Sequence, residues 1–218
     1  PLEAIDKDVN YIASLGVEFR FNTTVGKDVL FEDIMDEYDS VYLGIGTTVS
    51  RSTRVKNAEK AHLALPFLEE NKIGQSLNVG KEIIIIGGGN VAIDVAREAL
   101  RLQHMQYPGK KVIAKTVSLE DWDEMPAKKE EIEDAKAEGI EFNPAWGPKE
   151  VKLDEEGKIK GLLCMKVKSV FDEQGRFRPT FYEEKEIFLE GDMIIEAIGQ
   201  GPDFSFIPEG LFKKLEFT

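Results

Sequence analysis

Cysteine is nearly absent from this sequence, which has one, Cys164, among 218 residues. A single cysteine excludes an internal disulfide, a CxxC redox pair and an iron–sulfur or zinc centre built on cysteines. We expect Cys164 to be a half-buried strand residue. Histidine is also scarce: His62 and His104 stand alone, without the spacing of metal ligands, so we expect no metal site.

Long apolar runs and excess positive charge are missing as well. No stretch approaches the roughly 18 consecutive apolar residues that a membrane span needs, and the N-terminus lacks the features of a secretory signal. Acidic residues outnumber basic ones by 41 to 28, for a net charge of −13, which disfavours phosphate-backbone binding. We therefore expect no membrane or nucleic-acid partner and a cytoplasmic location. The 42% hydrophobic content is ample for a packed core.

The first third of the chain alternates helical and extended patterns. Apolar residues three and four apart predict a helix over residues 2–15, and Gly16 is a typical residue to end it. Alternation predicts a strand over residues 17–21, a second helix covers about 31–38, and residues 40–47 are typical of a buried strand that runs into a glycine-rich turn. The polar segment of residues 50–79, with a short helix at about 66–70, is interpreted as a connector.

A β-α-β unit follows at residues 82–117. It has a continuous apolar strand at 83–86, a helix at about 90–102 and a strand at about 112–117. Continuous hydrophobicity indicates a strand that is covered on both faces. The predicted fold class is therefore α/β, with a parallel sheet.

The later part of the chain combines a charged helix with more strands. The helix is expected at about 126–136, with Gly139 after it. Strands near 140–142, 159–170 and 181–189, separated by turns at Gly157 and Gly175, predict a β-meander. A further apolar strand at 193–198 ends in a second glycine-rich turn.

The strongest motif lies where the apolar strand meets the helix. Gly87, Gly89 and Ala92 match G-x-G-x-x-A directly after a strand and before a helix, which is the context of a dinucleotide-binding turn. The first glycine permits a tight turn, the second lets a diphosphate approach the backbone, and Ala92 allows close packing of the helix. The free N–H groups of the first helical turn favour the anion. The candidate cofactor-binding residues here are Gly87, Gly88, Gly89, Asn90 and Val91.

The end of the second strand bears on the choice of dinucleotide, because the adenosine ribose binds there. The stretch from Ser118 to Glu124 is acidic, so a 2′-phosphate would meet uncompensated negative charge, whereas a ribose hydroxyl can donate to Glu120. NADH is therefore favoured over NADPH. Glu120 lies 28 residues beyond Ala92, later than the usual ~20, and an insertion-like stretch at 104–109 accounts for the excess. The alternative is that these acids form only a solvated loop.

Two charged residues in the helix predicted at about 90–102 allow two interpretations. Asp94 and Arg97 either pair along the helix, as residues three and four apart commonly do, or face the cofactor. The sequence leaves both readings open.

Four stretches carry a resemblance to a known family. They are residues 87–97 (GGGNVAIDVAR), 125–127 (MPA), 42–47 (YLGIGT) and 191–203 (GDMIIEAIGQGPD). On these the chain resembles, nearly end to end, the small (beta) subunit of glutamate synthase and related FAD-dependent pyridine nucleotide oxidoreductases.

The resemblance implies a Rossmann-like NAD(P)H-binding domain inserted between partial segments of an FAD-binding domain. Residues 1–48 and 198–218 would belong to the flavin domain, and residues 49–197 to the NAD(P)H domain. The returning turn would place Gly199 and Gln200 near the nicotinamide.

Other family features are expected outside this chain, which we interpret as a fragment. The FAD fingerprint, and the cluster-binding cysteines that often precede it, would lie before Pro1, and a flavin-contacting segment would lie beyond Thr218. FAD, and in some relatives iron–sulfur clusters, would thus belong to the parent protein. Relatives that use NADPH usually carry a Tyr-Arg-Arg run and a further arginine, where this chain has Ser118-Leu119-Glu120 and Trp122.

The implied reaction is hydride transfer from nicotinamide C4 to flavin N5, which requires no catalytic acid or base from the protein. Electrons would pass to a glutamate synthase large subunit or to another electron-accepting subunit. A disulfide reductase is excluded because Cys164 has no partner cysteine. A non-catalytic nucleotide-sensing or interaction module stays open as the alternative.

Overall fold

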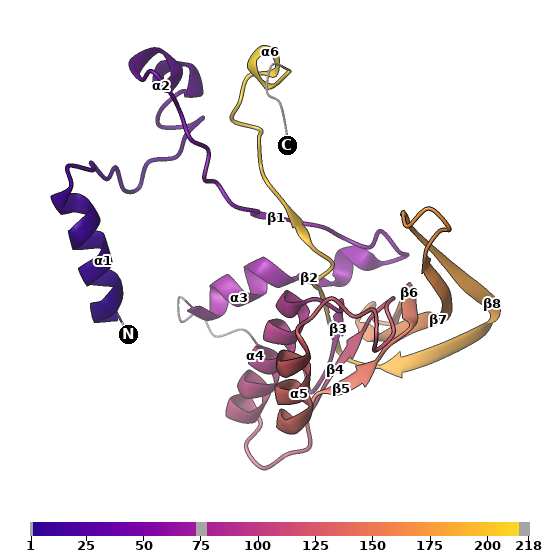
Figure 1. Ribbon diagram of the computed structural model, residues 1–218. Coiled ribbons are helices and arrows are strands. Elements are labelled where there is room, and N and C mark those ends of the chain that lie inside the picture. Colours follow the sequence, from indigo (N-terminus) through magenta and orange to yellow (C-terminus); the bar gives the residue numbers. More distant parts are fainter. Residues whose placement is uncertain (1, 73–77, 214–218) are drawn as a thin grey trace. The chain divides into compact units, whose positions relative to one another are not determined.

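The computed structural model describes residues 2–72 and 78–213 (Figure 1). Contacts within the chain divide it into two units. Unit 1 is drawn from the chain up to Ile45 and from Asp203 onward, and unit 2 runs from Gly46 to Pro202. The sequence-based domain boundaries follow residues 48 and 197. In the part of the chain that the structure describes, no helix is both long and apolar enough to cross a membrane.

Unit 2 is built on a five-stranded sheet in which every neighbouring pair is parallel, as the continuous apolar strand predicts. The central strand pairs with its neighbours in register, with Ile85 opposite Thr116 on one side and Ile195 on the other. In spatial order the strands are β2 (His62–Leu63), β9 (Met193–Glu196), β3 (Glu82–Ile86), β4 (Ile113–Val117) and β5 (Glu141–Asn143).

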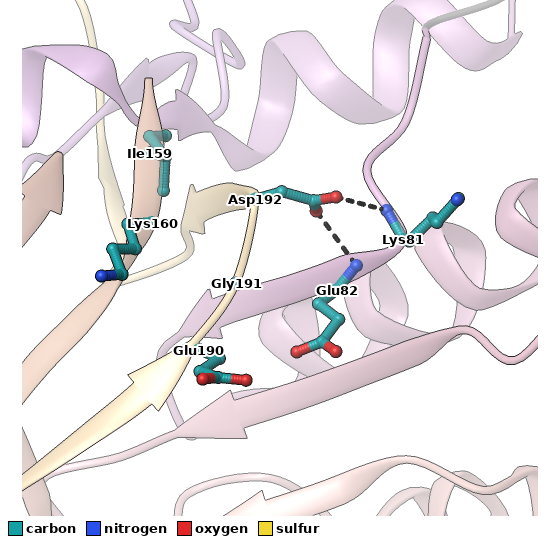
Figure 2. Close-up of a pocket in the computed structure, with 7 residues that line it drawn as sticks. All are labelled: Lys81, Glu82, Ile159, Lys160, Glu190, Gly191 and Asp192. Carbon is teal, nitrogen blue, oxygen red and sulfur yellow. Dashed lines mark hydrogen bonds between the residues drawn. The ribbon is translucent and has the colours of Figure 1, made fainter. Parts of the chain in front are cut away.

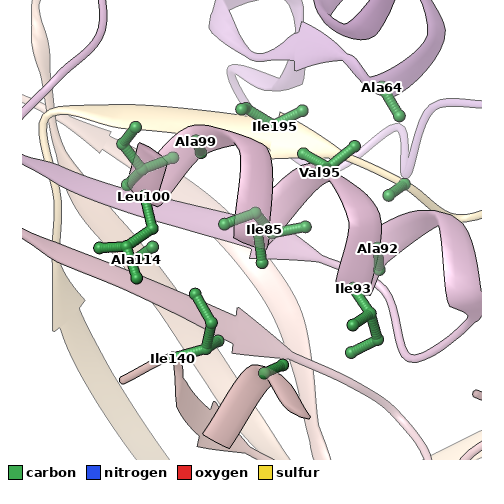
Figure 3. Close-up of a cluster of buried hydrophobic side chains, with 14 of the residues drawn as sticks. Ala64, Ile85, Ala92, Ile93, Val95, Ala99, Leu100, Ala114, Ile140 and Ile195 are labelled. Atoms are coloured by element: carbon green, nitrogen blue, oxygen red, sulfur yellow. The ribbon is translucent and has the colours of Figure 1, made fainter. Parts of the chain in front are cut away.

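Three helices cover one face of this sheet: α3 (Ala64–Lys72), α4 (Asn90–Gln106) and α5 (Lys129–Glu138). The buried side of α4 carries small residues, among them Ala92 and Ala99, which are fully buried in the same core cluster as Ile85 (Figure 3). Small side chains let the helix axis approach the strands closely. Gly139 ends α5 in the left-handed conformation, with φ 100°, as its position predicts.

The opposite face is covered by a three-stranded antiparallel sheet of β6 (Trp146–Leu153), β7 (Ile159–Phe171) and β8 (Phe177–Glu190). Ile84 and Ile86 point to this side, where they pack with Leu162 and Cys164. Successive isoleucines of β3 are thus buried in different layers, which explains why the run does not alternate. Cys164 is fully buried rather than half-buried, and this burial raises its thiol pKa to about 12.

The predicted meander is correct in kind but wrong in its first strand. Residues 140–142 correspond to β5, an edge strand of the parallel sheet, and the meander begins at β6 instead. Gly147 and Pro148 make β6 hard to predict from the sequence, because proline lacks the N–H that the hydrogen bonds between strands need. The β6–β7 register is indeed irregular between Pro148 and Glu150.

The segment interpreted as a connector is largely part of unit 2. It contributes β2 and α3, and its side chains Ala64, Phe67 and Val79 are buried in the core. It also holds the short helix η1 (Ala58–Lys60), and it begins in β1 (Val49–Ser50), which pairs with β10 (Gln200–Gly201). A two-residue strand is too short to show periodicity, so the sequence pattern misses it.

Unit 1 contains α1 (Leu2–Ser14), α2 (Phe31–Glu37) and α6 (Glu209–Phe212). The first two confirm the predicted helices, and Gly16 follows α1 with φ 93°. The predictions of strands at 17–21 and 40–47 are wrong: both segments are irregular, and Tyr42 is 94% exposed. A strand needs a hydrogen-bonded neighbour, and no strand pairs with either segment among the described residues.

Candidate dinucleotide-binding site

The glycine-rich turn joins the carboxyl end of β3 to the start of α4, with neighbouring strand ends on both sides. The N–H of Gly87 donates to the carbonyl of Val117 over 2.8 Å. The N–H of Ala197 donates to the carbonyl of Ile86 over 2.7 Å. The carboxyl ends of β9, β3 and β4 therefore meet at this turn. This edge of a parallel sheet is where α/β proteins bind their ligands.

Gly87 and Gly88 have no room for a side chain. Gly87 has φ 146°, and a Cβ there would lie 2.3 Å from the carbonyl oxygen of Ala197. A Cβ on Gly88 would lie 2.9 Å from Cβ of Ser118 and 3.1 Å from Oε2 of Glu120. These two glycines are required by the packing of the protein itself.

Gly89 differs from both. A Cβ there would meet no atom within 4 Å, and the backbone, with φ −90° and ψ 172°, suits any residue. Neither packing nor strain within the described residues calls for glycine at this position. Open space in front of the backbone is what a closely approaching diphosphate needs.

The same residue begins α4, and its surroundings favour an anion. Gly89 is the N-cap and carries no capping side chain, and its carbonyl accepts from Ala92 and Ile93 over 2.9 and 3.2 Å. The 17-residue helix directs its positive dipole end toward this point. The backbone N–H groups of Asn90 and Val91 belong to this first turn.

The Met-Pro-Ala segment braces the turn, a contact that the sequence does not reveal. The N–H of Ala127 donates to the Gly88 carbonyl over 3.0 Å, and the N–H of Lys128 donates to Oδ1 of Asn90 over 2.8 Å. Met125 is buried next to Gly88. The Asn90 side chain therefore holds this loop, which leaves its backbone N–H as the group for a ligand.

Glu120 lies beside the turn despite its long spacing from Ala92. The residue is half-buried, and its main-chain carbonyl accepts from the Ser118 hydroxyl and the Ala145 N–H, both over 2.9 Å. These bonds hold the backbone, and the carboxylate lies next to Gly88, with Oε2 3.1 Å from where a Cβ on Gly88 would be. Within the stretch 104–109, residues up to Gln106 extend α4.

Not every acid of this loop is available to a ligand. Oδ1 of Asp121 accepts from the N–H groups of Asp123 and Glu124 over 3.0 and 3.1 Å, which closes a local turn. Glu120 is the acid that lies against the glycine-rich turn.

Arg97 neither pairs with Asp94 along the helix nor faces the cofactor, the two alternatives that the sequence leaves open. Its side chain reaches across to α5. There the guanidinium nitrogens lie 3.3 Å, 3.7 Å and 2.5 Å from carboxylate oxygens of Glu131, Asp134 and Glu138, respectively. Its hydrogen bond to Glu138 lowers the pKa of that carboxyl below the ordinary value. Arg97 therefore joins two helices of the layer and does not face the cofactor side. Asp94 is exposed on the same helix.

The returning strand reaches the turn through Ala197. Gly199 and Gln200 follow it: Gly199 has φ 106° and accepts from the N–H of Arg51 over 3.0 Å, while Gln200 pairs with Ser50. Nearby is a group that sequence reasoning missed, the buried carboxylate of Glu196. It accepts from the backbone N–H of Thr53 over 3.0 Å and from the Thr53 hydroxyl.

An open hollow exists at the other end of the strands, where β3 and β9 begin (Figure 2). Oxygens of Asp192 accept there from the N–H groups of Lys81 and Glu82, each over 3.0 Å. The carboxylate is thus used to tie strand ends together. Because the hollow is at the amino edge of the sheet, it is separate from the glycine-rich turn. The described residues also hold no cluster of histidine, cysteine and acidic side chains suited to a metal.

Comparison with known families identifies the family to which this sequence belongs. Residues 20–214 match the family described as pyridine nucleotide-disulphide oxidoreductase. The chain belongs to this family. The family's proteins are oxidoreductases, and the fold class predicted from the sequence is confirmed.

Curated relatives support the resemblance to the glutamate synthase small subunit. The chain is 32% identical to the beta subunit of an NADPH-Fe(3+) oxidoreductase of Geobacter sulfurreducens over 97% of its length, and covers 31% of that protein. It is 29% identical to the small chain of glutamate synthase [NADPH] of Escherichia coli, over 92% of this chain and 44% of that one. It is also 32% identical to the beta subunit of an NADP(+)-dependent formate dehydrogenase of Moorella thermoacetica, over 95% and 29%. The chain thus spans less than half the length of these relatives, each named as a subunit or chain.

Solved structures share the fold at low sequence identity. FprA of Mycobacterium tuberculosis, in complex with NADPH, superposes with a TM-score of 0.65 at 18% identity, over 82% of this chain and 54% of that one. Thioredoxin reductase of Lactococcus lactis gives 0.52 at 18% identity, over 75% and 46%.

Proposed function

We propose that this chain is the NADH-binding part of a longer flavoprotein oxidoreductase of the glutamate synthase small-subunit type. The observation that carries the proposal is the open backbone at Gly89, directly in front of the α4 N-terminus. A glycine that neither packing nor strain requires, at the carboxyl edge of a parallel sheet, fits a site for a diphosphate.

Each part of the site has a role in holding the dinucleotide. The N–H groups of Asn90 and Val91 bind the diphosphate, and Gly87 and Gly88 keep the turn tight enough to present them. Glu120 accepts from the ribose hydroxyls at the end of β4. Gly199 and Gln200, after the returning strand, lie toward the nicotinamide.

The preference for NADH is the finer part of the proposal. Relatives named for NADPH or NADP(+) are similar to this chain, but Leu119, Glu120 and Trp122 stand where NADPH-using relatives have arginines. The Glu120 carboxylate lies against Gly88, where a 2′-phosphate bound at the ribose would meet a negative charge instead of a cation.

Unit 1 and the electron acceptor complete the proposal. We assign residues 1–48 and 198–218 to a flavin domain, because apolar side chains such as Tyr11, Phe21 and Tyr42 are largely exposed in unit 1 and suit further packing. When bound in the longer protein, NADH supplies the hydride and FAD accepts it. A separate subunit, such as a glutamate synthase large chain, then receives the electrons.

Calorimetric titration of the chain with NADH and NADPH tests the cofactor choice, with Glu120→Arg as the key variant. The native chain is expected to bind NADH more tightly, and the variant to shift the ratio of the two affinities toward NADPH by tenfold or more, since a charge-assisted bond replaces a repulsion. Asp123→Arg makes the same charge change on the same loop and serves as the control. A native preference for NADPH, or equal shifts in both variants, contradicts the assignment of Glu120 to the ribose.

A further inference from the structure

Trp122 is a large aromatic side chain that belongs neither to the glycine-rich turn nor to the proposed ribose contact. It follows Glu120 by two residues, in the loop after β4. Its ring packs against Phe142 of β5, with 5.4 Å between ring centroids. The indole therefore lies beside β5, in the loop that leaves the carboxyl end of β4.

Trp122 lies where the proposed dinucleotide would continue beyond its adenosine ribose. The sheet order β3-β4-β5 places the diphosphate turn first and the ribose carboxylate next. A dinucleotide that crosses the strand ends in this direction brings its adenine over the gap between β4 and β5. Trp122 is the aromatic residue of the loop at that point.

The ring is held in place and yet remains accessible. Phe142 supports it, and the Lys136 ammonium lies 3.7 Å from the ring centroid. The Asp121 turn and the buried Met125 fix the loop on either side. Trp122 is nevertheless 45% exposed. An indole that is held in place and nearly half exposed suits a flat, π-bonded ligand, which would stack on the part of the ring that Lys136 and Phe142 leave uncovered.

We propose that Trp122 is the residue that stacks on the adenine of the dinucleotide, an inference that rests on the proposed NADH site. Stacking of a base on an aromatic side chain strengthens binding by roughly fivefold to 150-fold, judged by alanine substitution. Trp122 therefore supplies affinity for the adenosine half, while Glu120 discriminates against its 2′-phosphate. An arginine in the same place would instead favour that phosphate.

The test uses ADP-ribose, which keeps the adenosine diphosphate half of NADH and lacks the nicotinamide. Trp122→Ala is expected to weaken ADP-ribose binding tenfold or more in calorimetry, and Trp122→Phe to weaken it less, because a smaller ring still stacks. Trp146→Phe, which changes the only other tryptophan, is expected to leave the affinity unchanged.

The same control variant gives a direct spectroscopic readout, since Trp122 is then the only indole. Addition of ADP-ribose is expected to quench its emission. Binding of ADP-ribose without quenching, together with native affinity in Trp122→Ala, overturns the stacking role and leaves the NADH site standing. If the native chain binds neither NADH nor ADP-ribose, the proposed function fails and the stacking role fails with it.

Discussion

Three consecutive glycines in the turn are glycine for different reasons. Gly87 and Gly88 are fixed by contacts within the chain, with Ala197 and with Ser118 and Glu120, whereas Gly89 faces open space. The sequence motif predicts all three, but only the structure separates the two that shape the turn from the one that leaves room for a ligand.

Gly89→Ala should therefore separate binding from folding. The added methyl group meets no protein atom, so the free energy of unfolding should fall by no more than about 1 kcal/mol, the scale of a weakened N-cap. NADH affinity should fall at least tenfold, because the methyl group occupies the diphosphate's approach. Calorimetry and urea unfolding measure the two effects.

Gly210→Ala is the matched control for that variant. Gly210 also has open space around its Cβ position, lies in α6 of unit 1 and has no positive φ. Native NADH affinity in Gly89→Ala, or an equal loss in both variants, would argue against a diphosphate at the turn.

Among the helices and strands, the sequence predicts best those whose own residues form a long regular pattern or carry a clear end signal. The isoleucines of β3, the periodic α4 and the glycine after α5 give the β-α-β unit and its flanking helix. The failures have long-range causes: the predicted strands at 17–21 and 40–47 have no neighbour to pair with, and β6 is hidden by Pro148. The role of Arg97 was likewise beyond reach, since its partners lie more than 30 positions away in α5.

The link between α4 and α5 leads to a prediction about pH. The Arg97 hydrogen bond lowers the pKa of Glu138 below the ordinary 4.5, so the unfolded state binds this proton more readily than the folded state. The stabilisation is complete above about pH 4.5 and is lost as the pH falls toward the lowered value. Arg97→Met should lower stability at neutral pH and reduce the further loss between pH 5 and 3.

Urea unfolding at a series of pH values measures this effect. Arg178→Met removes the same charge from an exposed position on β8 and serves as the control. An unchanged pH profile in Arg97→Met would show that the ion pairs do not contribute as described.

At the scale of the whole molecule, the two units differ in how complete their cores are. Unit 2 buries both faces of its parallel sheet, and the β1–β10 pair sets Val49 opposite Gly201, so its two chain ends lie together. In unit 1, Phe21 is 73% exposed and Tyr42 94% exposed. Family resemblance predicted an inserted domain, but periodicity alone placed β2 and α3 in a connector.

The chain of residues 46–202 should therefore fold on its own. It should unfold in one cooperative transition, as single domains of this size usually do, and bind NADH within about threefold of the full chain, a difference of less than 1 kcal/mol. Circular dichroism melts and calorimetry give the two readouts. A shortened chain that is unfolded, or that is folded but no longer binds NADH, would mean that unit 1 contributes to the site.

An amide NMR titration of the full chain with NADH tests the dinucleotide site most directly. The proposed site predicts that the largest shifts fall on Gly88, Gly89, Asn90 and Val91, followed by Glu120, with little change at Asp192 and Gly191 at the opposite edge of the sheet. Shifts confined to that opposite edge, or no shifts at millimolar NADH, would contradict the assignment of the glycine-rich turn as a dinucleotide site.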